Sequence, residues 1–221
     1  MNESGETTRW WWIRHAPVES GGRVYGHDDL PANCSDAALF SSLARLMPEQ
    51  AVWVTSQLQR TSQTAQAIHA QRTNGAQDVA ETLVEPRFAE QHFGEWQGLT
   101  HTEIAELRGE EWHRFWLSPA EQVPPGGESF VQLVERVSDA IVELSRAYAG
   151  RDIVAVTHGG TIRAALSLAL TLEPDRALSF SVDNCSLTRI DHIAGAPGSH
   201  APDHPEAWRV AAVNLLPRVT G

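Results

Sequence analysis

The feature that most constrains the fold of this chain is the run Ile153-Val154-Ala155-Val156, which is apolar at every position. A strand with one face in water alternates apolar and polar residues, so an unbroken apolar run indicates a strand covered on both faces. Residues 10–14 and 51–55 predict two further strands. Between the strands, apolar residues recur at helical spacing, most clearly over residues 130–148. Because strand and helix patterns alternate along the chain, we expect an α/β fold.

The other expected elements complete this alternation. Further helices are predicted at residues 39–47, 60–71, 102–107, 110–117 and 161–170, and further strands at residues 82–84, 179–190 and 208–213. The section from about residue 86 to residue 127 is irregular, and we expect it to cap a substrate site. Since no repeat or interdomain linker is evident, residues 1–221 are expected to form a single domain.

The charge balance excludes some classes of partner. The chain has 28 acidic and 17 basic residues, which gives a formal net charge of -11. This charge opposes non-specific binding to nucleic acids and anionic membranes, so we expect neither as a partner. It would also repel a phosphate ester at long range. Any site for such an ester must therefore gather positive charge locally.

The cysteines and the apolar segments indicate the compartment. Cys34 and Cys185 are the only cysteines and are not closely spaced, so neither a disulfide framework nor a thiolate zinc site is expected. The apolar run at residues 10–13 is too short for a secretory core. No stretch approaches the roughly 20 apolar residues that a membrane span needs. The cytoplasm is the expected location.

Polar segments follow three predicted strands directly, and a fourth lies in the irregular section. In open α/β sheets, ligands bind at the carboxyl ends of the strands, so we expect these segments to meet. Their chemistry-bearing residues are Arg14, His15, Arg60, Glu90, His158 and Gly159. Each of these residues, taken alone, has an ordinary structural explanation. A lone histidine after a strand is usually a solvated loop residue, for example, and paired glycines often allow a tight turn.

Together these residues form a set suited to phosphoryl transfer. Arg14 and Arg60 offer planar, forked donors to phosphate oxygens. His158 and the amides that open the next helix, including that of Gly159, add further donors. His15 is the expected nucleophile, which must be neutral, and nearby guanidinium charge lowers the pKa of an imidazole. Glu90 is expected to protonate the leaving alkoxide and then to accept a proton from water.

The same segments resemble the signature of the histidine phosphatase superfamily, also called the phosphoglycerate mutase-like family. Its Arg-His-Gly, Ser-x-Leu-x-Arg-Thr-x-x-Thr-Ala, Glu-x-x-Phe-Gly-x-Trp-x-Gly and His-Gly-Gly motifs correspond to residues 14–16, 56–65, 90–98 and 158–160. Residues 125–129 and 184–186 resemble two further family segments. One such motif would be weak evidence, whereas all of them in the family's order over positions 9 to about 190 are specific.

The resemblance implies a three-layer α/β/α sandwich around a mainly parallel central sheet. It implies that His15 is phosphorylated, that Arg14, Arg60 and His158 hold the phosphate, and that Glu90 is the proton donor. No cofactor and no metal are expected. Residues 21–30 loosely resemble the α-ribazole phosphatase branch. The expectation is thus a histidine acid phosphatase-type phosphomonoesterase that hydrolyses small-molecule phosphate esters.

Two departures from the family pattern keep alternatives open. Ala16 replaces the usual glycine, and the stretch 18–21 lacks an asparagine that touches phosphate in many members. Mutases keep this stretch more faithfully, which favours a phosphatase over a phosphoglycerate-mutase-type phosphotransferase. The same departures leave a non-catalytic phospholigand-binding protein as a further alternative.

Other patterns have weaker interpretations. Trp10 and Trp12 should share one face of their strand and pack in the core, with Trp11 on the other face. Trp96, Trp112, Phe115 and Trp116 either wall the site or pack short helices. The histidines at 192, 200 and 204 match no metal-binding spacing. Arg23 and His27 either border the pocket or lie on the surface. A homodimer paired through the late edge strands is compatible with the sequence but not required.

Overall fold

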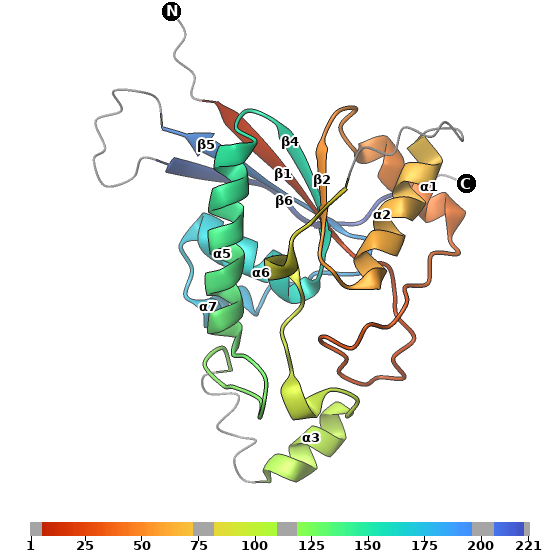
Figure 1. Ribbon diagram of the computed structural model, residues 1–221, viewed down its shortest axis with the longest axis vertical. Coiled ribbons are helices and arrows are strands. Elements are labelled where there is room, and N and C mark those ends of the chain that lie inside the picture. Colours follow the sequence, from red (N-terminus) through yellow and green to blue (C-terminus); the bar gives the residue numbers. More distant parts are fainter. Residues whose placement is uncertain (1–5, 73–81, 110–118, 196–205, 219–221) are drawn as a thin grey trace, which may run out of the picture.

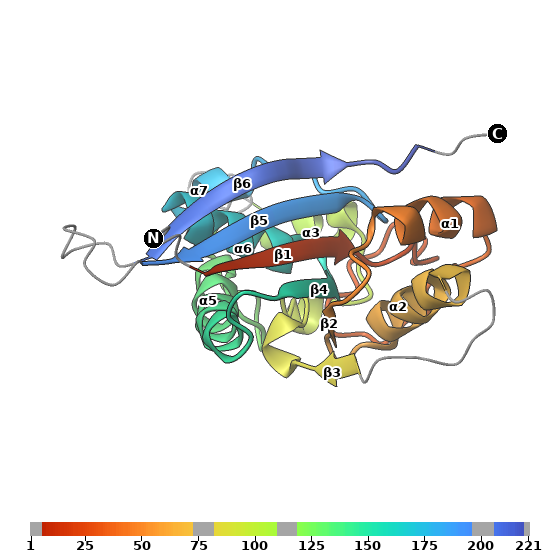
Figure 2. The same cartoon turned by 90° about the horizontal axis from the view of Figure 1, so that it is seen from above.

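The computed structural model describes residues 6–72, 82–109, 119–195 and 206–218. Within these residues six strands form one sheet in the order β3-β2-β4-β1-β5-β6 (Figures 1 and 2). The strands are β1 (Thr7–Arg14), β2 (Val52–Thr55), β3 (Thr82–Val84), β4 (Asp152–Thr157), β5 (Leu187–Ala194) and β6 (Glu206–Leu215). The apolar run Ile153-Val154-Ala155-Val156 lies in β4, near the centre of the sheet.

The sheet is parallel in its core and antiparallel at one edge. Strands β3, β2, β4 and β1 pair in parallel, whereas β5 is antiparallel to β1 and β6 is antiparallel to β5. This confirms the expected mainly parallel sheet. Because β2, β4 and β1 are neighbours and point the same way, their carboxyl ends lie side by side at one edge (Figure 2).

Helices cover both faces of the sheet and form the outer layers of the expected sandwich. Helices α1 and α2 lie on one face, and α5 and α6 lie on the other (Figure 1). The bounds are α1 (Ala37–Leu46), α2 (Gln59–Arg72), α3 (His101–Arg108), α5 (Phe130–Ala147), α6 (Gly159–Leu170) and α7 (Pro174–Ala177), with 3₁₀ turns η1 (Pro86–Phe88) and η2 (Gly94–Trp96). No helix among the described residues is long and apolar enough to cross a membrane.

The predicted tryptophan arrangement is confirmed. The rings of Trp10 and Trp12 are both buried and stack with centroids 4.8 Å apart, and Phe88 packs edge-on against them. Trp11 points to the other face, where its Nε1 donates to Asp152 at 2.8 Å. Alternation along β1 therefore places two large rings under α5, where they build the core on that face.

Helix ends follow signals in the sequence. Ser129 caps α5 by accepting from the amide of Gln132, whose side chain accepts in return from the amide of Ser129. This reciprocal capping box fixes where the helix begins. Asp36 is likewise the residue that caps the start of α1, and its Oδ1 accepts from the amide of Leu39 at 3.0 Å.

One predicted strand begins later than expected. Residues 179–186 were expected to open the strand that follows α6, but α7 and a loop occupy residues 174–186, and β5 starts at Leu187. Pro174 stands at the first position of α7, where its missing N–H is not needed. The strand then runs on through buried Asp191, whose carboxylate pairs with Arg189 and Arg209.

The irregular section contains η1, η2 and α3, and α3 lies away from the sheet at the lower end of the view in Figure 1. The helix predicted at residues 110–117 lies outside the described residues, and so do Trp112, Phe115 and Trp116. Trp96 is buried, with the Arg108 guanidinium 5.1 Å from its ring centroid. It therefore packs within this section.

Candidate active site

The fold brings the predicted site residues to one edge of the sheet. Arg14 ends β1 and His15 follows it, Arg60 is the second residue of α2 after β2, and His158 caps α6 after β4. The rings of His15 and His158 lie 5.2 Å apart, although 143 positions separate them in sequence (158 − 15). Glu90 reaches the same place from the loop after η1, because it accepts from the amide of Gly160 at 3.1 Å.

His15 is held in one tautomer. Its Nδ1 lies 2.7 Å from the carbonyl oxygen of Ala16, and a carbonyl only accepts, so Nδ1 carries the proton. Its Nε2 then holds the lone pair, and this buried atom has no hydrogen-bond partner among the described residues. Burial, with the charges of Arg60 and Arg14, lowers the pKa of His15 to about 3. His15 is therefore neutral at physiological pH, with an unoccupied nucleophilic nitrogen.

The two predicted arginines lie close enough to His15 to influence its pKa, and backbone carbonyls fix both. Arg14 donates through Nη1 to the carbonyl of Val182 at 2.6 Å, while its Nε is buried and has no partner among the described residues. Arg60 is fully buried and donates to the carbonyls of Asp28 at 2.9 Å and Gly26 at 2.5 Å. Neutral acceptors orient these cations and leave their charge for a ligand.

His158 is fully buried and also has an assigned tautomer. Its Nδ1 accepts from Arg60 Nε at 3.3 Å, so the proton is on Nε2, which donates to Ser56 Oγ at 2.8 Å. Burial, followed by the nearby groups of His15 and Arg60, lowers the pKa of His158 well below its usual value. Two neutral imidazoles therefore stand beside two fixed guanidinium groups.

Glu90 is oriented by backbone on both sides. Its Oε1 accepts from the amides of Gly160 at 3.1 Å and Gln91 at 3.0 Å. Its own carbonyl accepts from His27 Nε2 at 2.7 Å and from Arg136 at 3.0 Å. His27 therefore borders the site, which is one of the two positions that the sequence left open for it. Arg23 is exposed and donates instead to the Gly98 carbonyl and Glu103.

This set of a free imidazole nitrogen, unpaired guanidinium groups and a carboxylate can be compared with known proteins. The family model described as "Histidine phosphatase superfamily (branch 1)" matches residues 10–201. The chain belongs to the histidine phosphatase superfamily.

Similar members of the superfamily are known by sequence. A metal-independent phosphoserine phosphatase of Arabidopsis thaliana is 33% identical over 161 residues, which is 69% of this chain and 64% of the relative. The glucosyl-3-phosphoglycerate phosphatase of Mycolicibacterium vanbaalenii is 30% identical over 94% of each chain. Several relatives are longer proteins. The matched region spans 66% of phosphoglycerate mutase-like protein 4 of Arabidopsis thaliana and 38% of a bifunctional protein of Mycobacterium tuberculosis.

Solved structures agree on the fold. The native structure of a mycobacterial glucosyl-3-phosphoglycerate phosphatase superposes with a TM-score of 0.78 at 26% identity, covering 95% of this chain and 99% of that one. An α-ribazole phosphatase from Shigella flexneri gives a TM-score of 0.71 at 20% identity, covering 93% and 96%. The second likeness concerns the fold alone.

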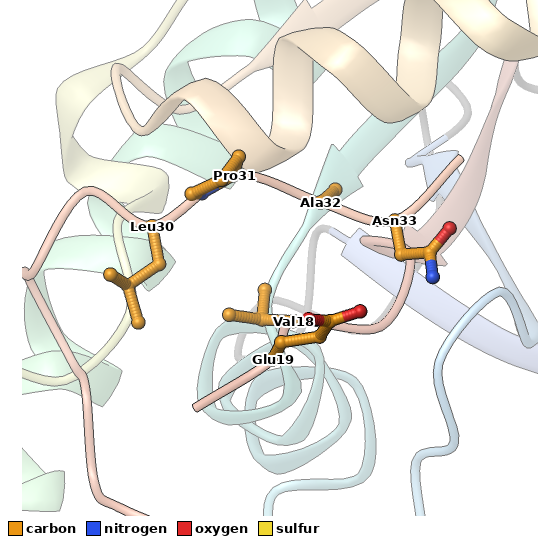
Figure 3. Close-up of a pocket in the computed structure, with 6 residues that line it drawn as sticks. All are labelled: Val18, Glu19, Leu30, Pro31, Ala32 and Asn33. Carbon is orange, nitrogen blue, oxygen red and sulfur yellow. The ribbon is translucent and has the colours of Figure 1, made fainter. Parts of the chain in front are cut away.

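In this member of the superfamily the replacement of glycine by Ala16 is accommodated. Ala16 is buried but does not have a positive φ, so a β-carbon causes no backbone strain there. Its amide donates to Thr64 Oγ1 at 2.9 Å. The second departure is the stretch 18–21, which lacks the family's asparagine. Part of this stretch lines a cavity of about 420 Å³, whose lining residues lie on two facing segments (Figure 3). These residues are Val18, Glu19, Leu30, Pro31, Ala32 and Asn33.

Three contributors to the site were not among the predicted site residues. Asn184 donates to the His15 carbonyl at 2.7 Å, and Tyr25 lies under the Arg60 guanidinium with 4.9 Å between its ring centroid and Cζ. Arg163, one turn into α6, lies beside Gly159. The family-like segment at 184–186 signalled the first, whereas no sequence signal pointed to Arg163.

Of the three histidines considered for a metal site, only His192 is among the described residues, and it pairs with Thr8 at the end of β1 away from His15. His192 is buried in β5 against Trp208, while residues 200 and 204 lie outside the described residues. Among the residues that the structure describes, no three histidine, cysteine or acidic side chains are grouped so that they could hold a metal ion.

Proposed function

We propose that this chain is a phosphomonoesterase that hydrolyses small-molecule phosphate monoesters through a phosphohistidine on His15. The observation that carries the proposal is the buried, unpartnered Nε2 of His15, whose ring lies within the electrostatic influence of Arg60 and Arg14. A lone pair without a partner in a protein interior is costly unless a ligand uses it. Here the surrounding charges are those that a phosphoryl group requires.

In the first step His15 Nε2 forms a bond to phosphorus while the ester P–O bond breaks. Arg14 and Arg60, with the amide of Gly159, balance the charge on the phosphoryl oxygens. His158 was expected to hold the phosphate directly, but its neutral ring accepts from Arg60 Nε and donates to Ser56, so we propose that it orients the Arg60 guanidinium instead. The leaving alkoxide takes a proton from the carboxyl group of Glu90. Because His15 is already neutral, the attack needs no prior deprotonation of the ring.

In the second step water attacks the phosphorus of the phosphohistidine, and the N–P bond breaks. Glu90, now a carboxylate, accepts the proton of that water. The Ala16 carbonyl keeps the proton of His15 on Nδ1 throughout, so Nε2 returns as the lone-pair nitrogen. Inorganic phosphate then leaves the site.

We also propose the finer assignments, a histidine acid phosphatase-type reaction and independence from metal ions. The donor set supports both, since it consists of nitrogens that bind phosphate oxygens directly. A relative whose name describes a metal-independent phosphoserine phosphatase supports the second.

The test is to trap the intermediate. Purified protein is mixed with a ³²P-labelled phosphate monoester in the presence of EDTA and quenched in alkali, where phosphohistidine survives. We expect labelled protein and released phosphate, and neither from His15→Ala. His101→Ala, which changes an exposed histidine on α3, is the matched control and should behave as wild type. Label on any other residue, or turnover that EDTA abolishes, would contradict the proposal.

The same experiment separates the two alternatives. A phosphoglycerate-mutase-type phosphotransferase would return the label in an isomeric ester instead of inorganic phosphate. A non-catalytic phospholigand-binding protein would bind the ester without label transfer.

We further propose a cytoplasmic protein whose partner is a small phosphate ester, with neither nucleic acid nor membrane as partner. The net charge of -11 and the two free cysteines support this. If two copies pair as a homodimer, the proposed contact is the edge strand β6, which has a neighbour on one side only among the described strands.

A further inference from the structure

Arg163 places a third guanidinium group at the edge of the candidate site. It lies four residues after Gly159 on α6, so both residues share one face of the helix. Its Nε donates to the carbonyl of Phe180 at 2.8 Å, which fixes the side chain. A β-carbon built on Gly159 would lie 3.2 Å from Arg163 Nη1 and 3.6 Å from Arg14 Nε. The two guanidinium groups therefore border the same small space above Gly159.

The charge of Arg163 is not neutralised by the protein. Among the described residues, no carboxylate lies within 4.0 Å of Arg163, Arg14 or Arg60. By contrast, the part-buried Arg87 and Arg136 each pair with a glutamate, at 2.8 Å and 2.6 Å. Arg14, Arg60 and Arg163 thus bring three guanidinium groups to the site with no carboxylate within 4.0 Å among the described residues. An unpaired, part-buried cation beside two others indicates an anionic ligand.

Arg163 lies on the Glu90 side of the site. Its Nη1 lies over Gly159, and the amide of the next residue, Gly160, donates at 3.1 Å to Glu90, the proposed proton donor to the leaving oxygen. In an in-line displacement the leaving oxygen is opposite the nucleophile. A guanidinium near Glu90 is therefore placed to meet the alcohol part of the ester.

We propose that Arg163 is a specificity-determining residue that binds a carboxylate on the alcohol part of the substrate. The inference rests on the proposed phosphatase function and extends it to a substrate class, phosphate monoesters of hydroxy acids. Arg14 and Arg60 already serve the phosphoryl group, so the one additional cation matches one additional negative charge. The planar fork of a guanidinium also matches the two oxygens of a carboxylate.

A matched pair of substrates tests this. 3-Phosphoglycerate and glycerol 3-phosphate differ only in a carboxylate in place of a CH₂OH group. We expect wild type to prefer 3-phosphoglycerate in kcat/KM by about tenfold or more, as a charge-assisted hydrogen bond predicts. Arg163→Gln should reduce this preference to about twofold or less, mostly through KM for 3-phosphoglycerate, and Arg163→Lys should restore part of it.

The control is Arg151→Gln, which removes the same charge from an exposed residue at the opposite end of β4 and should keep the wild-type preference. Equal turnover of the two esters by wild type would overturn the inference without requiring the variant to fold. An equal loss on both esters in Arg163→Gln would also overturn it, because Arg163 would then bind the phosphoryl group. Absence of turnover of any ester, with no labelled His15, would instead overturn the proposed function.

Discussion

At the scale of single residues, the candidate chemistry depends on hydrogen bonds between side chains and backbone. The Ala16 carbonyl selects the tautomer of His15, the amide of Gly160 orients Glu90, and two carbonyls hold Arg60. Backbone groups position these side chains well because the packed elements to which they belong cannot shift independently. Gly160 is the most demanding of these positions, since a β-carbon there would lie 2.3 Å from Glu90 Oε1.

This closeness leads to a prediction for Gly160→Ala. The added methyl group should displace the Glu90 carboxylate, so the variant should resemble Glu90→Gln. Both should turn over an alkyl phosphate roughly 10²-fold more slowly, as loss of a general acid predicts. Both should lose much less on p-nitrophenyl phosphate, whose leaving group needs no proton. Steady-state kinetics on the two esters measure this, and a similar loss on both would contradict it.

At the scale of elements, helix α5 does more than cover the sheet. Its Arg136 donates to the carbonyls of Arg87, Ala89 and Glu90, and it pairs with Glu128 in the loop before the helix. The capping box at Ser129 fixes the residue at which α5 begins, and this sets where Arg136 lies relative to the segment it contacts. A structural helix therefore holds the segment that carries the proposed proton donor.

We predict that Arg136→Met lowers both stability and activity. Three carbonyls and the part-buried Glu128 each lose a charged donor, which should cost about 2–4 kcal/mol in the free energy of unfolding. The value of kcat should also fall, because the segment that carries Glu90 loses one of the contacts that hold it. Adding Glu128→Gln removes the uncompensated charge and should recover part of the stability but not kcat. Urea unfolding and steady-state kinetics measure the two effects, and full recovery of kcat in the double variant would contradict this role.

At the scale of the whole molecule, the fold lowers the pKa of four histidines, which favours their neutral form. Burial is the largest cause of the lowered pKa of His15, His158, His27 and His69. In the unfolded chain these groups titrate near pH 6.5. Below that pH the unfolded chain binds more protons than the folded one, so folding becomes less favourable as the pH falls.

The sign and range of this pH dependence are testable. The contribution of His15 should be fully present above about pH 6.5 and should be lost progressively as the pH falls toward its folded pKa of about 3. The free energy of unfolding, measured with urea between pH 4.5 and 7.5, should therefore rise with pH. His15→Ala should flatten this slope, and the exposed control His101→Ala should not. A wild-type stability that is constant over this range would refute the prediction.

Much of this protein was predictable from local patterns. The unbroken apolar run of β4, the alternation in β1 and the capping signals depend on neighbouring residues, so they identified the α/β class and most elements. The start of β5 was misplaced because the polar loop before it keeps enough apolar residues to resemble a strand. The motif order also named the residues that meet at the site, although their roles remain predictions.

What the sequence determined by itself was therefore the kinds of groups available and the elements that carry them. Only the tertiary structure decided how these groups are placed against one another, because β4 pairs between β1 and β2 and so brings the His158 ring to 5.2 Å from that of His15. It also decided the neutral state of both histidines, since desolvation depends on what covers a residue and not on its neighbours in sequence. Arg163 illustrates the limit, because its missing carboxylate partner is a property of the space around it.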